Sequence, residues 1–322
     1  MKRVIPALIL FLVLAMAYVL WLKRGTGGSG NNGRPPDAYV YDIEKYRATP
    51  NADLLFDELA GFEVALKEPR GIAAGPDKGL FVVGDAELVR LDGEGREAER
   101  IALKGAANCV TSDGAGKVYA GLADHIAVWS PGTTNVVHWG SLGENALLTS
   151  ISADAGNVFA ADFGNRVIWR CDTQGRLLGA IGGKDAASGS SGFILPSPYF
   201  DLAIRDDRLW VVNPGRTRVE EYTFEGRMLS HWGRSSMRPE GFCGCCNPSH
   251  IALFPDGRFV TSEKGLPRVK VYDAKGVFVG LVAGPDMFAE DAVGLDLAVD
   301  SRGRILVLDP ARRMVRVFAA KG

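Results

Sequence analysis

The sequence predicts an all-β protein, a six-bladed β-propeller, preceded by one N-terminal transmembrane helix. Three observations support this prediction. A pattern of short apolar strands and Gly- or Asp-rich turns occurs six times, with a period of about 40–50 residues and four strands per unit, which is typical of propellers. A spare strand precedes the first unit, and the last unit ends after its third strand. A continuous apolar segment stands at the N-terminus.

The N-terminal segment, residues 4–22, is apolar throughout and has a basic pair on each side. At ~1.5 Å per residue such a helix reaches about 28 Å, close to the ~30 Å thickness of a bilayer core. We therefore predict an uncleaved signal anchor within residues 1–24. The alternative is a cleaved signal peptide with an A-x-A site at residues 15–17, which would give a secreted protein. The basic N-terminus favours a cytoplasmic N-terminus and a propeller in the periplasm or outside the cell.

Residues 25–60 are predicted to be a flexible linker and lead-in segment, since residues 25–36 are rich in Gly and end in a Pro pair. The propeller is predicted to cover residues 61–322. Its last unit lacks a fourth strand, and we expect the strand at residues 61–66 to supply it. Closing the ring in this way would leave no unpaired sheet edges.

The second strand of each unit shows the repeat best, as an apolar run that follows a tight turn and ends in a polar residue. Gly, Asp and Asn recur in those turns because they tolerate left-handed or Asx-turn backbone. The third strands mostly alternate polar and apolar residues, as expected for strands with one packed face. The six second strands are at residues 79–85, 117–123, 157–163, 208–214, 258–264 and 304–310.

Three segments carry a resemblance to a known family. They are PRGIAAGPDKGLFVVGD at residues 69–85, GNVFAADFGNRVIWRCDTQGRLLGAIG at 156–182 and NPSHIALFPDGRFVTSEKGLPRVKVYDAKG at 247–276. They resemble NHL repeats, and the resemblance extends from about residue 61 to the C-terminus. It implies a six-bladed NHL-like propeller, here in a membrane-anchored protein of bacterial type. It does not imply one activity, because NHL-like propellers include protein-binding modules, RNA-binding modules and a few enzymes.

The formal net charge is −1, which gives no overall electrostatic attraction to nucleic acid. An RNA-binding propeller of this type would be expected to carry a basic face. We therefore expect no nucleic-acid partner.

Three of the five cysteines lie close together, at Cys243, Cys245 and Cys246, with His250 nearby. The first interpretation is a disulfide that stiffens the loop, between Cys243 and Cys246 or between the adjacent Cys245 and Cys246. The second is a metal site in which these thiolates and His250 bind Zn²⁺ or Cu(I). The third is a redox-active thiol pair, because Cys243 and Cys246 have dithiol spacing.

A second candidate site follows from the register of the repeat. The residue just before the first apolar position of each innermost strand should lie near the mouth of the central channel. His250, Asp201 and Asp296 could hold a divalent ion there, with Cys109 as a further ligand on the opposite blade. The alternative is that these polar residues only solvate the channel. The six positions are Gly71, Cys109, Ser150, Asp201, His250 and Asp296.

Residues 248–253 are similar to a segment of the peptidyl-hydroxyglycine amidating lyases, NHL-like propellers that hold zinc through several histidines. Only His250 matches their ligands, since the other channel positions are Gly, Cys, Ser and Asp. Their activity is therefore not carried over to this chain.

A further set of polar residues ends the second strands, namely Asp85, Asp162, Asn213, Glu263 and Asp309. Their repetition at the blade period indicates structural contacts rather than catalysis. Glu263 and Lys264 depart most from the repeat and lie in the blade of the cysteines, so they are candidates for an additional role.

Together these observations predict a membrane-tethered, extracytoplasmic binding or scaffold module. Its special site would be the cysteine-rich loop, and its partner a protein or small molecule at the loop face. One alternative is a metal-dependent propeller enzyme, a lyase or hydrolase with its ion at the channel mouth. Another is a redox or metal-handling accessory of a membrane complex.

Overall fold

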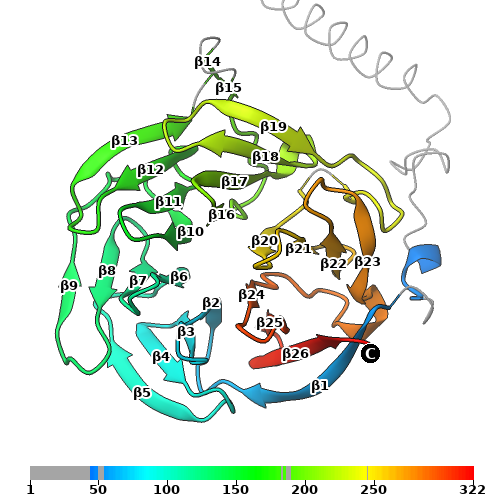
Figure 1. Cartoon of the computed structure of the whole chain (residues 1–322), viewed down its shortest axis with the longest axis horizontal. Coiled ribbons are helices and arrows are strands. Elements are labelled where there is room, and N and C mark those ends of the chain that lie inside the picture. Colours follow the sequence, from blue (N-terminus) through cyan, green and yellow to red (C-terminus); the bar gives the residue numbers. More distant parts are fainter. Residues whose placement is uncertain (1–43, 50–53, 183, 186–189, 245) are drawn as a thin grey trace, which may run out of the picture. The chain divides into compact units, whose positions relative to one another are not determined.

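The structure, a computed structural model, describes residues 44–49, 54–182, 184–185, 190–244 and 246–322. In this part of the chain, six four-stranded antiparallel sheets are arranged as blades around a central axis (Figure 1). The prediction of an all-β, six-bladed propeller is therefore confirmed. In blades one to five the chain runs from the innermost strand to the outermost strand. In the last blade, β24, β25 and β26 follow the same order, and β1 from the N-terminal side is the outermost strand.

The strands follow the chain blade by blade. Blades one to three contain β2 (Pro69–Ala74), β3 (Leu80–Gly84), β4 (Glu87–Leu91), β5 (Glu97–Ala102), β6 (Cys109–Ser112), β7 (Val118–Gly121), β8 (Ile126–Trp129), β9 (Val136–His138), β10 (Leu148–Ala153), β11 (Val158–Asp162), β12 (Val167–Cys171) and β13 (Leu177–Gly182). Blades four to six contain β16 (Leu202–Arg205), β17 (Arg208–Asn213), β18 (Arg218–Thr223), β19 (Met228–Trp232), β20 (His250–Leu253), β21 (Phe259–Glu263), β22 (Arg268–Tyr272), β23 (Phe278–Ala283), β24 (Leu297–Val299), β25 (Ile305–Asp309), β26 (Met314–Ala320) and β1 (Phe56–Glu63).

Short elements connect or flank the blades. They are the two-stranded hairpin β14 (Lys184–Asp185) and β15 (Ser190–Ser191) and the 3₁₀ turns η2 (Glu44–Tyr46), η4 (Pro214–Arg216) and η5 (Pro285–Met287). No helix in the described ranges has the length and hydropathy of a membrane span. The predicted anchor within residues 1–24 and most of the predicted linker lie outside the described residues.

The ring is closed by an N-terminal strand, as expected, but at a different position. Strand β1 pairs antiparallel with β26 from Phe56 opposite Ala320 to Glu63 opposite Met314. The predicted closing strand at residues 61–66 therefore overlaps only its end. The apolar pattern fails here because β1 is an outermost strand, and most of its residues are exposed. Figure 1 shows β1 running along the outer edge of the last blade.

The core lies between the blades rather than in one central mass. Each of six buried clusters is built from two consecutive blades, such as Val83 and Leu88 of blade one with Val118 and Ala127 of blade two. The second strands are enclosed on both faces, and every residue of β3 and β11 is buried. This burial explains why the second strands are continuous apolar runs, whereas the outer strands alternate.

Candidate functional site

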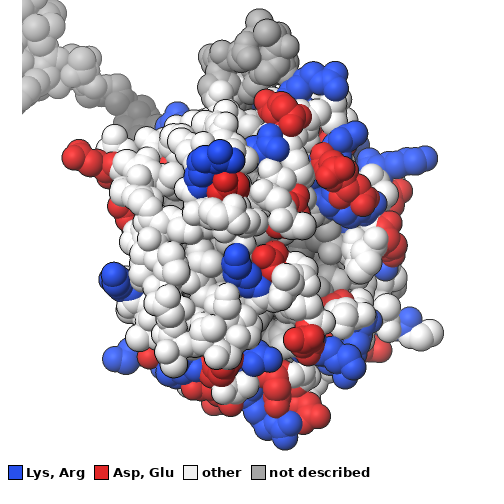
Figure 2. All heavy atoms as spheres, turned by 60° about the vertical axis from the view of Figure 1, so that its left-hand side comes forward, with Lys and Arg blue, Asp and Glu red and all other residues white. Residues whose placement is uncertain are grey.

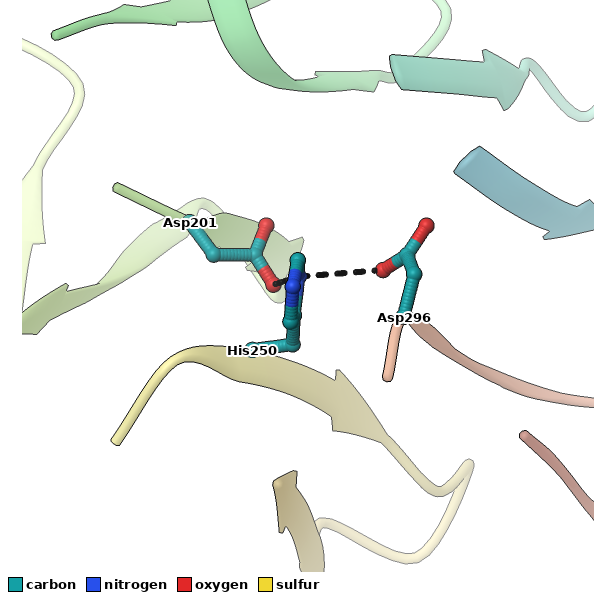
Figure 3. A group of neighbouring side chains, drawn as sticks. All are labelled: Asp201, His250 and Asp296. Carbon is teal, nitrogen blue, oxygen red and sulfur yellow. Dashed lines mark ion pairs between the residues drawn. The ribbon is translucent and has the colours of Figure 1, made fainter. Parts of the chain in front are cut away.

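Three of the predicted channel residues meet at the axis, namely Asp201, His250 and Asp296 (Figure 3). The His250 Nδ1 atom lies 3.3 Å from Asp296 Oδ1 and 3.6 Å from Asp201 Oδ2. His250 is the first residue of β20, while the two aspartates immediately precede β24 and β16. Consecutive blades four, five and six therefore each contribute one side chain from the same level of the repeat.

The two carboxylates are fixed by the main chain. Asp201 accepts hydrogen bonds from its neighbour Leu202 N (2.8 Å) and, in the next blade, from Ile251 N (2.7 Å). Asp296 accepts in the same way from Leu297 N (2.8 Å) and from Ile72 N of blade one (2.8 Å). Each aspartate thus links two blades. The site is pre-organised because its acidic side chains are also part of the framework.

Two opposite effects act on the pKa of the buried His250 imidazole. Burial lowers the pKa of its imidazole, but the carboxylates of Asp201 and Asp296 outweigh this effect and raise the pKa to about 10. Its other ring nitrogen, Nε2, is buried and has no hydrogen-bond partner among the described residues. A buried polar atom without a partner is rare in proteins and indicates a missing ligand, ion or water.

The separations between these atoms fit a divalent ion. Strong N–H···O hydrogen bonds are ~2.7–3.2 Å long, and both His250 contacts exceed this range. Two ligand atoms that each lie ~2.1 Å from one tetrahedral Zn²⁺ are about 3.4 Å apart. One imidazole and two carboxylates form a donor set for Zn²⁺ or a similar divalent ion, and two negative charges would balance its charge.

Cys109 does not join this group, although the repeat register places it at the same level. Its side chain packs into the core between blades two and three and lies against Gly121, where an added Cβ would approach the sulfur to 2.5 Å. Burial, and then the negative charges of Asp296 and Asp201, raise the pKa of the thiol well above its usual value. Cys109 is therefore a neutral core thiol in this structure. The described ligand set contains no sulfur.

A pocket of about 500 Å³ opens above His250. Its walls combine apolar surface from Leu147, Tyr199 and three prolines with the basic side chains of Lys67 and Arg70. A second cavity of about 320 Å³ forms the channel below, lined by Asp201, Asp296 and the inner strands. His250 and the two aspartates thus stand between a mixed apolar and polar pocket and the central channel.

Tyr199 connects this pocket to the cysteine-rich loop. Its ring packs edge-on against His250, with ring centroids 5.6 Å apart, and Lys264 Nζ lies 5.0 Å from the centre of the same ring. The main-chain N–H of Lys264 donates to Asn247 Oδ1, which belongs to that loop. Lys264 therefore lies where the loop meets the rim of the pocket.

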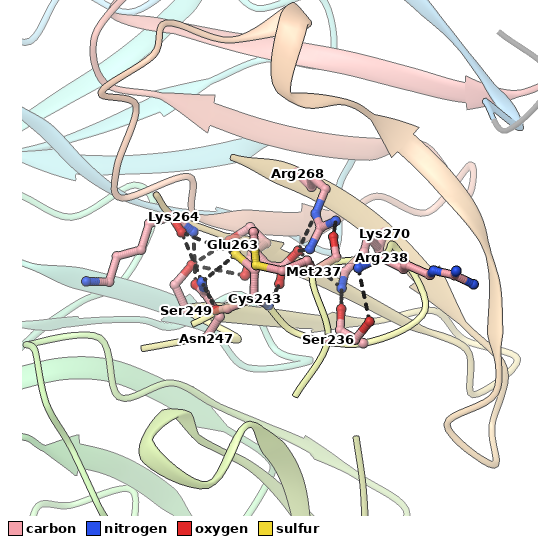
Figure 4. A network of polar contacts seen from close by, with 12 residues as sticks. Ser236, Met237, Arg238, Cys243, Asn247, Ser249, Glu263, Lys264, Arg268 and Lys270 are labelled. Atoms are coloured by element: carbon pink, nitrogen blue, oxygen red, sulfur yellow. Dashed lines mark hydrogen bonds and ion pairs between the residues drawn. The ribbon is translucent and has the colours of Figure 1, made fainter. Parts of the chain in front are cut away.

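The cysteine-rich loop is held by buried polar contacts (Figure 4). The predicted disulfide between Cys243 and Cys246 is absent, because the Cys243 thiol is turned inward, within 3.3 Å of Asn247 Nδ2 and 3.9 Å of the Lys264 carbonyl oxygen. Burial, and then the negative charge of Glu263, raise the pKa of this thiol to about 11. Such a thiol is a poor nucleophile at neutral pH. Cys245 lies outside the described residues.

Glu263 anchors the loop from below. Its carboxylate accepts from Cys243 N (2.7 Å) and pairs with Arg268 (2.6 Å) and Lys270 (3.2 Å), and all three charged side chains are buried. Three of the other polar residues that end second strands act on incoming loops in the same way, whereas Asp309 accepts from Arg312 N in the turn that follows it. They are Asp85, which accepts from Lys67 N and Glu68 N, Asp162, which accepts from Leu147 N, and Asn213, which accepts from Ile194 N. Glu263 therefore shares the framework role of its counterparts and adds a buried pair of cations.

No family model matches the sequence, and no curated protein matches it. Solved propellers match it in shape. A Bacteroides thetaiotaomicron protein of unknown function has a TM-score of 0.59 at 14% identity, covering 83% of this chain and 72% of that chain. The catalytically inactive histidine-to-alanine variant of virginiamycin B lyase from Staphylococcus aureus, solved with quinupristin, has a TM-score of 0.55 at 10% identity, covering 83% and 100%. The WD40 propeller domain of Doa1 has a TM-score of 0.55 at 13% identity, covering 79% of each chain. Likeness at such low identity shows the fold alone.

Sequence reasoning placed the axial group but missed the pocket wall. Tyr199 and Pro198 belong to the connection that enters blade four, Lys67 belongs to the one that enters blade one, and Arg70 is the second residue of β2. Only the recurrence of such connections before each innermost strand could have indicated that they lie around one opening.

Proposed function

We propose that this propeller is a small-molecule-binding module whose ligand occupies the pocket above His250, with a divalent ion held by Asp201, His250 and Asp296. One observation carries the proposal, namely a buried histidine with an unpartnered Nε2 atom and two fixed carboxylates at the base of a 500 Å³ pocket. Pockets that combine apolar walls with a few convergent polar groups are typical ligand sites. The channel mouth thereby replaces the cysteine-rich loop as the preferred site.

The proposed ion would supply positive charge where the ligand enters. It would attract an oxygen-bearing group of the ligand toward the base of the pocket, while the apolar wall around Tyr199 would take the remainder. Zn²⁺ fits the donor set better than Cu(I), because oxygen and imidazole are harder ligands than thiolate.

A second candidate function is a metal-dependent lyase or hydrolase at the same site. The Asp–His–Asp group favours it, because a bound divalent ion acts as a Lewis acid and His250 could move a proton beside it. The fold likeness to virginiamycin B lyase is compatible with this candidate. Quinupristin, the compound in that structure, is therefore the first molecule to test.

We further propose that residues 1–24 tether the propeller to a membrane from the extracytoplasmic side. The apolar segment at residues 4–22 and its basic flanks support this proposal. The visible charge pattern supports the absence of a nucleic-acid partner, because Figure 2 shows basic and acidic side chains intermixed on the face that it displays.

Titration of the purified full chain with Zn²⁺ tests the proposal. At the axial site we expect one ion, which is lost, or bound at least tenfold more weakly, in the His250→Ala variant and in Asp296→Asn. The matched control is His231→Ala, which removes an exposed histidine of β19. Equal Zn²⁺ binding by the wild type and the His250→Ala variant would contradict the axial site.

Quinupristin separates the two candidates. Conversion of quinupristin that needs the divalent ion and is lost in His250→Ala would establish the enzyme. Ion-dependent binding of quinupristin without conversion would support the binding module. A chain that holds the ion but neither binds nor converts quinupristin would exclude this compound as ligand and substrate.

A further inference from the structure

A second cluster of histidines lies away from the axis, in blade two. His125 Nε2 is 3.0 Å from His138 Nδ1, and His125 Nδ1 is 2.8 Å from the carboxylate of Asp124. Asp124 and His125 lie in the turn between β7 and β8, and His138 ends β9, so both imidazoles lie on the outer part of the blade. All three side chains are partly exposed, with 22% exposure for the His125 side chain. Dissolved ions can therefore reach the cluster.

This cluster replaces a framework contact that other blades make. The second strands of blades one, three, four and five end in an acid or amide that accepts an N–H from the incoming loop. In blade two, β7 ends at Gly121, and main-chain bonds hold the turn instead, from Leu122 N to the His125 carbonyl and from Leu142 N to the Asp124 carbonyl. The side chains of Asp124, His125 and His138 are therefore available for another role.

The contacts define the protonation of the pair. The Asp124 carboxylate can only accept, so His125 carries a proton on Nδ1, and its neutral form presents a lone pair at Nε2. His138 then donates from Nδ1 in the metal-free protein. Both imidazoles must be neutral to bind a metal ion.

From this geometry we propose that His125 Nε2 and His138 Nδ1 form a binding site for a late divalent first-row cation, Zn²⁺ or Cu²⁺. The two nitrogen atoms are 3.0 Å apart, and they need to separate only to about 3.4 Å to bind one tetrahedral Zn²⁺ at ~2.1 Å each. The ion takes the place of the shared proton, and the His138 proton moves from Nδ1 to Nε2 without net release. Asp124 orients His125 from behind, as in carboxylate–histidine–zinc groups.

The site lies on the same face of the propeller as the axial pocket. The Ala123 carbonyl, one residue before Asp124, accepts the N–H of Leu148, which follows the pocket residue Leu147. The two sites are nonetheless separate, because no side chain of the histidine pair lines the pocket. The proposal of a metal site at His125 and His138 can therefore be tested independently of the proposed function.

Histidine-selective ¹⁵N NMR of the full chain during titration with Zn²⁺ tests this site. We expect the ring signals of His125 and His138 to shift together, with the His138 proton moving from Nδ1 to Nε2, while the exposed His231 stays unchanged. His125→Ala and His138→Ala should each weaken this Zn²⁺ binding at least tenfold. Asp124→Asn should weaken it about 10- to 100-fold through loss of orientation.

The His250→Ala variant distinguishes the two metal sites, because it should remove the axial ion and leave the response of His125 and His138 intact. Thermal unfolding of every variant checks that the fold is preserved. The proposal is overturned if excess Zn²⁺ leaves both ring signals of the wild type unchanged. It is also overturned if the ring signal of His138 still responds undiminished to Zn²⁺ in a folded His125→Ala variant.

Discussion

Asp201 shows how one side chain can serve both the framework and the site. One oxygen accepts from Leu202 N, and the other accepts from Ile251 N and faces His250. A residue that ties blade four to blade five is therefore also a candidate ligand. Structural and chemical roles can be separated here only by substitutions that keep one and remove the other.

Asp201→Ala should destabilise the protein strongly, because it removes the side-chain acceptor of Ile251 N and leaves Leu202 N with only its longer bond to Ser150 Oγ. Hydrogen bonds to charged groups contribute ~1.5–3 kcal/mol each, so we expect the free energy of unfolding in urea to fall by about 3 kcal/mol or more. Asp201→Asn keeps an amide oxygen and should cost less, while still weakening ion binding. The control is Asp57→Ala, an exposed position of β1, which should change stability by less than ~0.5 kcal/mol. Equal effects of Asp201→Ala and Asp57→Ala would contradict the linking role.

Lys270 provides a test of the buried charges under the cysteine-rich loop. Burial lowers the pKa of its ammonium, the negative charge of Glu263 opposes this effect, and the positive charge of Arg268 adds to it. The resulting pKa is about 8. Between pH 8 and the unfolded value of 10.5, the unfolded chain binds a proton that the folded chain has released. Stability therefore rises with pH in this window, by about 3 kcal/mol across 2.5 pKa units.

Urea unfolding of the wild type and Lys270→Met between pH 8 and 10 would measure this contribution. The wild type should gain stability relative to Lys270→Met as the pH rises, because the variant lacks the titrating group. Parallel pH profiles of the two proteins would show that Lys270 keeps an ordinary pKa.

At the scale of the strand, closure depends on β1. Six pairs of residues join β1 to β26, and Arg316 on β26 forms a two-contact ion pair with Glu58 on β1, at 2.7 Å for each contact. The last blade has no other fourth strand in the described part of the chain. Without β1, the edge of β26 would be open to pairing with other molecules.

Two truncations test this closure. A chain that begins at residue 44 contains the whole compact unit of residues 44–322 and should keep the melting temperature of the full chain within a few degrees. A chain that begins at residue 64 lacks β1 and should aggregate or fail to fold cooperatively. A soluble, monomeric chain from residue 64 with an unchanged melting temperature would contradict the closing role of β1.

The same strand shows what could be predicted from sequence. Buried second strands such as β11 can be recognised in the sequence as continuous apolar runs, because both of their faces are packed. The outermost β1 has a single buried residue, Phe56, and its other residues are mostly exposed, so its start was predicted five residues too late. Repeat register was enough to bring Asp201, His250 and Asp296 to one level. It could not predict the orientation of Cys109, because register fixes the backbone position, whereas local packing fixes the side chain.

At the scale of the molecule, the candidate site arises from the ring itself. Asp201, His250 and Asp296 are up to 95 positions apart in the chain, and each lies at or directly before the start of an innermost strand. Six blades bring such positions around one axis, so a small number of substitutions in equivalent places is enough to build a site. The connections that precede the blades form much of its wall, and surface loops of this kind commonly carry the residues that bind a ligand.

The last prediction concerns how this ring is held in the cell. If residues 4–22 act as an uncleaved anchor, the full chain should sediment with membranes and resist extraction at high pH, whereas a chain that begins at residue 44 should not. With the N-terminus in the cytoplasm, protease added from the extracytoplasmic side should digest the propeller. Cleavage after residue 17 would instead release a shorter soluble chain, which mass spectrometry would identify. That outcome would show that the protein is secreted rather than anchored. The proposed metal sites would then lie in the same compartment, but without a tether to the membrane.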